Sequence, residues 1–351
     1  MSKEPKVTII MLNFNGKRYL GELLDKAIDS ALNQKYTNLE VIFADNGSSD
    51  GSIEYVLNKY GDKVRVIELG KNYGFCLGNN IASRHASHNS KYLLFMNPDA
   101  ILNSDYVTKL VHAMELDGSI GMAQGLQISL DGVTHKIGGF IDNYGRSFDI
   151  DVKPVIKSLN KPIEVLWVSG SAMLIRKELF ERLKGFPASF FMYYDEIDLC
   201  TRALFKGYKA VGIPDAIYYH RSGGIARSNE INWLSWYFEN RNRWITTIRY
   251  LPLIHLLKSL LVALPLELLV NIAKSIKAQK IRTRLYLKII IYLAKNFRRE
   301  LVVRSRYRSK IEALRKFIVH IPNPLMKHSS MLALNKIAGQ LSKKTLYEDQ
   351  R

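Results

Sequence analysis

The sequence predicts an α/β fold with a mostly parallel sheet, followed by a helical region rich in positive charge. Short apolar, β-branched runs alternate with helix-period stripes through the first hundred residues, and the last third combines an apolar stretch with most of the net positive charge. The chain has 351 residues, 47% hydrophobic and 24% charged, so its composition is globular and its length suits two domains. We divide it into an α/β domain over residues 1–228 and a helical region over 229–351.

Four buried strands are predicted in the first hundred residues, because each apolar run ends at a polar or glycine-bearing segment. The runs are residues 7–12, 41–44, 64–69 and 92–96. Between them, apolar residues at helical spacing predict helices over 20–31 and 53–60. This alternation implies helices on both faces of the sheet.

The middle of the chain is less regular. We expect a strand over 121–130, a loop-rich segment over 132–161, a strand with a bend at its centre over 165–175, and a late strand over 216–220. These later segments continue the same domain.

Polar side chains gather where the predicted strands end. Asn13 and Asn15 follow the first strand, Asp45 the second, and Asn97 and Asp99 the fourth. Ligands of such sheets bind outside the carboxyl ends of the strands, so these side chains are candidates for one ligand site. The alternative is that loops are polar for conformational reasons alone.

The C-terminal region has the composition of a membrane-surface segment. Residues 251–273 are apolar but contain charges and two prolines, and residues 274–316 hold fifteen Lys or Arg against two acids, a net charge of +13 out of +19. Positive charge beside an apolar stretch favours an anionic membrane surface over nucleic acid. We expect a helical tail that associates with the membrane rather than spanning it; the alternative is a helical subdomain packed on the first domain.

The N-terminus and the cysteines indicate the compartment. The first six residues run into a strand without an apolar signal segment, and there are only two cysteines, Cys76 and Cys200. We therefore expect a cytoplasmic protein, peripheral on the cytoplasmic face of the membrane. The oligomeric state stays open.

Five motif blocks stand in order along residues 6–250. They are residues 7–15 with Asp45-Asn46-Gly47-Ser48-Ser49-Asp50-Gly51-Ser52; Lys71-Asn72-Tyr73-Gly74-Phe75 with Asn79-Asn80; Asn97-Pro98-Asp99-Ala100; residues 167–176 with Gly185-Phe186, Phe190-Phe191 and residues 194–202; and His220 with Glu239-Asn240-Arg241-Asn242-Arg243. Together they resemble the family 2 glycosyltransferases, which have the Rossmann-like GT-A fold, and in particular the rhamnosyltransferase-like branch.

The resemblance implies a nucleotide-sugar site. Asp45 is expected to accept a hydrogen bond from the nucleobase, with Asn13 and Asn15 lining the same pocket. Asn72 and Gly74 are expected to lie along the sugar and diphosphate of the sugar donor.

The resemblance also implies a divalent cation, Mg²⁺ or Mn²⁺, that neutralises charge on the departing nucleoside diphosphate. Asp99 is the expected metal ligand, and His220 a third contact to the metal or the diphosphate. Here the chain departs from the Asp-x-Asp motif of the family, because Asn97 offers a neutral amide in place of a carboxylate.

A general base for the acceptor hydroxyl is expected in the acidic run that follows Tyr194. Register with the family assigns the base to Glu196, with Asp195 as the alternative, while Asp198 is expected to cap a helix. Arg241 is expected to grip the diphosphate or an anionic acceptor; its alternative is a basic helix face.

Taken together, the sequence predicts an inverting, metal-dependent hexosyltransferase. The sugar donor would be a dTDP-deoxysugar such as dTDP-rhamnose, or a UDP-sugar, and the acceptor a hydroxyl of a glycan or lipid-linked intermediate in cell-surface polysaccharide synthesis. Three alternatives stay open: a nucleotidyltransferase, a non-catalytic sugar-nucleotide-binding protein, and a nucleic-acid binder, which the clustered charge disfavours.

Overall fold

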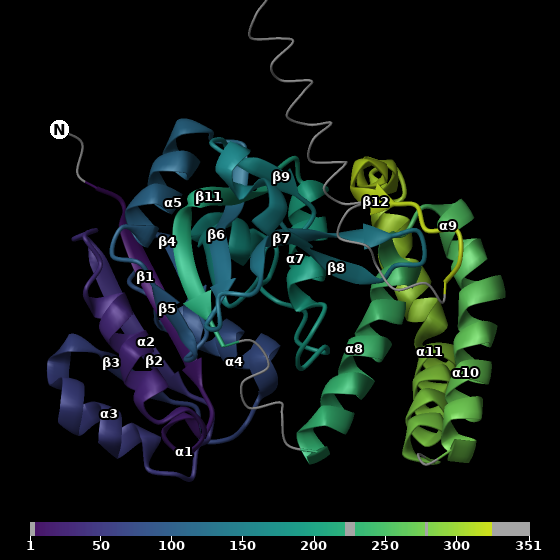
Figure 1. Cartoon of the computed structure of the whole chain (residues 1–351), viewed down its shortest axis with the longest axis horizontal. Helices are drawn as coiled ribbons and strands as arrows, with labels where there is room; N and C mark the ends of the chain where they lie inside the picture. The colour runs from purple at the N-terminus through teal and green to yellow at the C-terminus, as the bar shows by residue number, and fades with distance from the viewer. Residues whose placement is uncertain (1–3, 222–228, 278–279, 325–351) are drawn as a thin grey trace, which may run out of the picture.

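A mixed β-sheet organises the structure. The computed structural model describes residues 4–221, 229–277 and 280–324, and twelve strands occur in this part of the chain (Figure 1). The strands are β1 (Lys6–Asn13), β2 (Leu39–Asp45), β3 (Arg65–Glu68), β4 (Ser90–Met96), β5 (Ala100–Leu102), β6 (Ile120–Ser129), β7 (His135–Asp142), β8 (Ser147–Asp151), β9 (Ile163–Val165), β10 (Ala172–Arg176), β11 (Lys209–His220) and β12 (Ile318–Val319). The main path runs β12-β7-β6-β10-β4-β1-β2-β3.

The first part of the sheet is parallel, as the alternating pattern predicts. β1 pairs in parallel with β2 and β4, and β2 pairs in parallel with β3. The carboxyl ends of β1, β2 and β4 therefore meet at one edge, where the polar residues at the strand ends gather.

The later strands make the sheet mixed. β10 is antiparallel to both β4 and β6, and β11 pairs with β6 in parallel but with β5 and β9 antiparallel. The predicted bent strand over 165–175 is therefore wrong: it divides into the end of β9 and all of β10, which pair with different partners. The loop-rich segment predicted over 132–161 is also largely wrong, because it contains the hairpin β7–β8.

Helices cover both faces of the sheet. The predicted helix over 20–31 is found as two, α1 (Gly16–Leu20) and α2 (Glu22–Leu32), and the second predicted helix is α3 (Ser52–Tyr60). Three further helices were not predicted: α4 (Gly74–Ala82), α5 (Tyr106–Leu116) and α6 (Lys177–Arg182). The helix that Asp198 was expected to cap is part of α7 (Asp195–Leu204), which begins three residues before Asp198. Neighbouring strand residues point to opposite faces. Ile9 accordingly joins the core under α2, α3 and α5, while Ile10 joins the core under α4, α6 and α7.

The core under α4, α6 and α7 continues into the C-terminal helices, which form a layer beside the sheet (Figure 1). They are α8 (Asn229–Tyr250), α9 (Leu253–Lys258), the π-helical turn η5 (Ser259–Ala263), α10 (Leu264–Lys277) and α11 (Lys280–Tyr307), followed by the 3₁₀ turn η6 (Ile311–Phe317). α11 packs against α8 on one side and α10 on the other, and Trp244 and Tyr286 are fully buried between the layers. The wide turn η5 directly precedes Pro265, whose ring cannot follow a regular helical turn.

Candidate functional site

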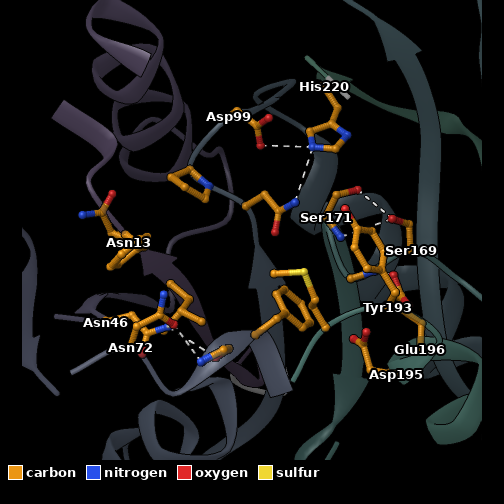
Figure 2. Close-up of a pocket in the computed structure, with 18 of the residues that line it drawn as sticks. Asn13, Asn46, Asn72, Asp99, Ser169, Ser171, Tyr193, Asp195, Glu196 and His220 are labelled. Carbon is orange, nitrogen blue, oxygen red and sulfur yellow. Dashed lines mark hydrogen bonds and ion pairs between the residues drawn. The ribbon is translucent and has the colours of Figure 1, made fainter. Parts of the chain in front are cut away.

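A cavity of about 400 Å³ opens at the carboxyl ends of the parallel strands. Eight of the residues predicted for the site line it: Asn13, Asn72, Gly74, Asn97, Asp99, Asp195, Glu196 and His220. In Figure 2, Asn13 and Asn72 lie on one wall, Asp195 and Glu196 on another, and Asp99 and His220 at a third side. Residues far apart in the sequence therefore surround one space.

The first wall contains a buried acceptor that has no partner. Asn13, at the end of β1, donates from Nδ2 to Asp45 Oδ2 at 2.9 Å and to Ser48 Oγ at 3.2 Å. Its other amide atom, Oδ1, is buried, and no hydrogen-bond partner for it exists within the described residues. Leaving a buried acceptor unpaired costs about 1–3 kcal/mol. A Cβ atom at Gly16 would lie 2.1 Å from this oxygen, so it packs against the glycine that begins α1.

Asp45 and Asn15 do not line the cavity but shape its wall. Asp45 is fully buried, and its Oδ1 accepts hydrogen bonds from the backbone N–H groups of Gly47 and Ser48 at 3.1 and 2.8 Å. Asn15 precedes α1 in the left-handed conformation, and its Oδ1 accepts from the backbone N–H of Ser49 at 2.9 Å. Both side chains join the loop after β1 to the loop after β2.

Asn46 is a lining residue that was not among the predicted site residues, although it belongs to the quoted Asp45-Asn46-Gly47 motif. Its Nδ2 donates to Asn72 Oδ1 at 3.1 Å and its Oδ1 accepts from the backbone N–H of Tyr73 at 3.0 Å. Asn72 Oδ1 also accepts from the N–H of Gly74 at 2.8 Å. These bonds hold the loop before α4 against the end of β2.

Asp99 and His220 meet because of strand pairing. β5 begins directly after Asp99, and β11 ends at His220, which lies opposite Ala100 in the antiparallel β5–β11 pair. The distance from His220 Nε2 to Asp99 Oδ1 is 3.0 Å, and that from Asn97 Nδ2 to His220 Nε2 is 3.4 Å. Carboxylate and imidazole are common metal ligands. Within the described ranges, however, no group of three or more His, Cys, Asp or Glu side chains is arranged to hold a metal ion.

The acidic pair stands at the start of α7. Burial raises the pKa of Asp195 well above its ordinary value, and the negative charge of Glu196 raises it further. Burial also raises the pKa of Glu196, whose Oε1 lies 3.5 Å from the backbone N–H of Gly170. The segment Ser169–Ser171, predicted only as a bend, thus forms part of the wall. Met192 and Tyr193 complete this side, and no sequence pattern marked them as site residues.

Asp198 and Arg241 lie elsewhere. Asp198 was expected to cap a helix, but it does not cap α7. Its carboxylate instead accepts hydrogen bonds from Arg202 Nε at 2.6 Å and from Tyr250 Oη at 2.8 Å. Arg241 does not line the cavity either. Its guanidinium is buried and donates to the backbone carbonyls of Ser189 and Phe190 at 2.7 and 3.0 Å.

The C-terminal helices contain one stretch apolar enough to cross a membrane, Leu253–Ala273, and 22% of its most apolar window is buried. Its exposed side chains form what we call the apolar face. They are Leu253, Ile254, Leu257, Leu261, Val262, Leu269 and Ile272.

Comparison with known proteins gives consistent findings. The sequence model of the family described as Glycosyl transferase family 2 matches residues 8–184. The rhamnosyltransferase WbbL of Escherichia coli K12 is 25% identical over 257 residues, which cover 70% of this chain and 94% of that protein. An N-acetylglucosaminyl-diphospho-decaprenol L-rhamnosyltransferase of Mycobacterium tuberculosis CDC 1551 is 23% identical over 214 residues, covering 54% of this chain and 69% of that protein.

Among solved structures, a mannosyltransferase of Pyrobaculum calidifontis in complex with GDP-Man and Mn²⁺ superposes with a TM-score of 0.51 at 18% identity. The match covers 84% of this chain and 88% of that one. At this identity the likeness concerns the fold.

Proposed function

The chain belongs to glycosyltransferase family 2 and has its GT-A fold, and from this premise we propose that it is an inverting enzyme that transfers a sugar from a nucleoside diphosphate to a hydroxyl group. One observation carries the proposal. A single cavity combines an Asp99–His220 pair with two acids whose pKa values are raised, Asp195 and Glu196.

Glu196 acts as the general base in this proposal. A base must reach the acceptor hydroxyl and be ionised, and a raised pKa makes its carboxylate a better proton acceptor. Glu196 is only partly buried, whereas Asp195 is 2% exposed, so the longer and more accessible carboxylate is favoured. Figure 2 draws the acids and the Asp99–His220 pair on different sides of the cavity. Attack from one side and departure from the other give inversion at the anomeric carbon.

Asp99 and His220 would hold a divalent cation. Asp99 would supply a carboxylate ligand and His220 an imidazole ligand, and Asp99 Oδ1 and His220 Nε2 are already 3.0 Å apart. The cation, when bound, supplies positive charge that stabilises the departing diphosphate.

Asn13, Asn46 and Asn72 would bind the nucleotide side of the sugar donor. The nucleotide we propose is dTDP or UDP. The relatives named as rhamnosyltransferases support rhamnose as the transferred sugar, so dTDP-rhamnose is the sugar donor we propose first. The mycobacterial relative is named for a lipid-linked sugar diphosphate, and we propose an acceptor of that class for this chain in glycan synthesis.

The helical region was predicted over 229–351, of which 278–279 and 325–351 lie outside the described residues. We propose that this region keeps the enzyme, whose proposed catalytic domain is 1–228, on the cytoplasmic face of an anionic membrane. The apolar face consists of side chains 41–74% exposed, and Lys258 is the one charged side chain exposed between them on α9 and η5. The neighbouring α11 presents Arg284, Lys288, Lys295 and Arg298 to solvent. Apolar and basic side chains on adjacent helices suit an interfacial position.

The packing of α10 against α11 supports helices that lie in the plane of the membrane rather than a helix α10 that crosses it. Thr283 Oγ1 donates to Asn271 O at 3.0 Å, and Tyr286 Oη donates to Glu267 Oε2 at 2.8 Å, so the two helices are joined. If α10 crossed the bilayer in this arrangement, the basic side chains of α11 would enter the hydrocarbon, at about 2.5–3.5 kcal/mol for each one near the centre.

A thermal-shift panel of nucleotide sugars, each with and without Mn²⁺, tests the sugar donor and the cation. A specific ligand raises the melting temperature by mass action. We expect a dTDP- or UDP-sugar to stabilise the protein, more strongly with Mn²⁺, and the Mn²⁺ increment to disappear in His220→Ala.

A nucleotide-release assay with the donor found in this way tests catalysis. Asp99→Ala and Glu196→Gln should each abolish most transfer. Full transfer by both variants would refute the assignment, and binding of the sugar donor without turnover across a panel of acceptors would favour a non-catalytic sugar-nucleotide-binding protein.

A further inference from the structure

Three residues just before α7 have a backbone conformation that bulky side chains rarely adopt. Phe191, Tyr193 and Tyr194 have φ angles of 68°, 65° and 61°. Such left-handed conformations are unfavourable for L-residues and persist only where surrounding contacts hold them. We call residues 190–194 the strained segment. The acidic pair follows it directly, because α7 begins at Asp195.

One side chain of α8 holds most of this segment. The two hydrogens of Asn242 Nδ2 face three backbone carbonyl oxygens, those of Phe190, Met192 and Tyr193, at N···O distances of 3.0, 2.8 and 2.9 Å, so one hydrogen is shared between two oxygens. Asn242 is fully buried, so these hydrogen bonds are shielded from water. A single amide thus fixes the path of the backbone on both sides of the first left-handed residue.

Arg241 determines which way the Asn242 amide faces. Arg241 Nε and Nη2 donate to Asn242 Oδ1 at 2.9 and 2.8 Å, which leaves Nδ2 of Asn242 directed at the three carbonyls. Arg241 Nη2 also donates to the carbonyls of Ser189 and Phe190. Its guanidinium stacks over the ring of Phe238, with a distance of 4.6 Å to the ring centre. We call this arrangement the Arg241–Asn242 clamp.

The strained segment also contacts the start of α4, on the opposite wall of the cavity. The carbonyl of Phe191 accepts from the backbone N–H of Cys76 at 3.2 Å, and the Phe191 ring stacks on Phe238 with ring centres 5.0 Å apart. A Cβ atom at Gly74 would lie 2.5 Å from the Phe191 ring, so only glycine fits there. The position of Phe191 therefore affects both the wall that carries Gly74 and the wall that carries the acids.

We infer that Asn242, oriented by Arg241, is a positioning residue for glycosyl transfer: it holds the strained segment so that Asp195 and Glu196 face the cavity. Neither clamp residue lines the cavity, so they act through the segment and not on the substrate. The inference rests on the proposed function, and it gives the C-terminal helix α8 a part in the arrangement of the catalytic residues.

Asn242→Ala tests the clamp, with Asn240→Ala as the matched control. Asn240 lies two residues earlier on the same helix, and its side chain donates to the carbonyl of Trp236 within that helix. Since a displacement of about 1 Å in an active site can cost roughly 100-fold in rate, we expect Asn242→Ala to lower kcat by about that factor. The KM for the sugar donor should change by a smaller factor than kcat, because the clamp reaches the donor wall only through the contact of Phe191 with α4, and the acidic limb of the pH–rate profile should shift. Asn240→Ala should match the wild type in all three.

Hydrogen–deuterium exchange gives a readout that does not depend on activity. Amides in residues 190–198 should exchange faster in Asn242→Ala than in the wild type or in Asn240→Ala, at equal global stability. Arg241→Lys keeps the positive charge but loses the paired donors to Asn242. It should raise the exchange rate and lower kcat by smaller factors than Asn242→Ala, and it replaces Asn242→Ala as the test variant if that protein does not fold. The inference would be overturned if Asn242→Ala and Arg241→Lys both exchanged residues 190–198 at the wild-type rate and both kept the acidic limb of the wild-type pH–rate profile. If the wild type transfers no sugar, the proposed function fails, and the exchange experiment still decides whether the clamp holds the segment.

Discussion

At the scale of single residues, Asp195 and Glu196 are neighbours with different surroundings. Asp195 is almost fully buried, and its Oδ2 has no hydrogen-bond partner in the part of the chain that the structure describes. Glu196 is more accessible and lies beside Gly170 in the cavity wall. When one of two neighbouring carboxyl groups is ionised, its negative charge raises the pKa of the other. One of the two therefore loses its proton at lower pH, and that one is the better candidate for the general base.

The pH dependence of transfer should identify this base. Burial raises the pKa of Glu196, and a base must be deprotonated to act, so kcat should fall as the pH drops through a value above the ordinary pKa of a glutamate, about 4.3. Asp195→Asn should retain transfer and leave the acidic limb nearly unchanged, because the charge of Glu196 helps to raise the pKa of Asp195, so Asp195 is still protonated when Glu196 ionises. Glu196→Gln should reduce kcat by about 10²–10⁴-fold. The reverse pattern, with loss in Asp195→Asn and activity in Glu196→Gln, would assign the base to Asp195.

At the scale of elements, a buried ion network joins α7 to two C-terminal helices. Asp198 of α7 accepts from Arg249 of α8 at 3.1 Å, and Arg249 Nε donates to Glu300 of α11 at 2.6 Å. Burial alone would raise the pKa of Asp198, but the charges of Arg202 and Arg249 lower it below its ordinary value. Because the folded-state pKa is the lower one, this stabilisation is present above the ordinary aspartate pKa and is lost as the pH falls through the folded-state value.

Glu300→Gln should therefore destabilise the whole protein at neutral pH. Glu300 is fully buried, and removing its charge leaves Arg249 without one of its partners. Breaking a buried pair from one side costs about 3–5 kcal/mol, and the amide retains part of the hydrogen bonding, so we expect about 2–4 kcal/mol less free energy of unfolding in urea denaturation at pH 7. Glu312→Gln, in an exposed pair with Arg315, is the control and should unfold like the wild type. Equal midpoints for the two variants would show that the network contributes little.

At the scale of the whole molecule, the basic side chains of α11 and the apolar face both lie away from the cavity at the strand ends. The apolar face belongs to α9, η5 and α10, and Figure 1 places α10 at the edge of the molecule away from the parallel strands. A soluble protein rarely exposes so many large apolar side chains in a continuous stripe unless another surface covers it. An anionic bilayer is the proposed partner, since basic α11 lies next to this face.

Leu261→Asp should weaken binding to vesicles that contain phosphatidylglycerol. Leu261 is 74% exposed on the apolar face. Its insertion is worth about 1.5–3 kcal/mol, so the partition coefficient should fall at least about tenfold in a sedimentation assay. Leu116→Asp is the matched control, because Leu116 is also 74% exposed but lies on α5 of the catalytic domain. Equal partitioning of the two variants, or binding that does not depend on anionic lipid, would contradict the membrane-surface role.

The sequence by itself determined the fold class and part of the cavity. The parallel strands and the polar residues at their ends are local features: each strand is an apolar run, and a polar residue follows it within a few positions. Asn13, Asn97 and Asp99 could be predicted for this reason, whereas Asn72 was predicted from the motif that resembles the family. The order of the motif blocks was enough to indicate the family, which the comparisons confirm.

Only the tertiary structure decided which charged residues face the cavity and which hold the protein together. Asp198 and Arg241 belong to motif blocks just as Glu196 does, yet Asp198 pairs with Arg249 and Arg241 binds backbone carbonyls about fifty residues away in the sequence. His220 reaches Asp99 only through the antiparallel pairing of β5 and β11. A local pattern specifies the residue type and the helix or strand, but a buried charge is directed by the partner that compensates its desolvation, and that partner comes from a distant element.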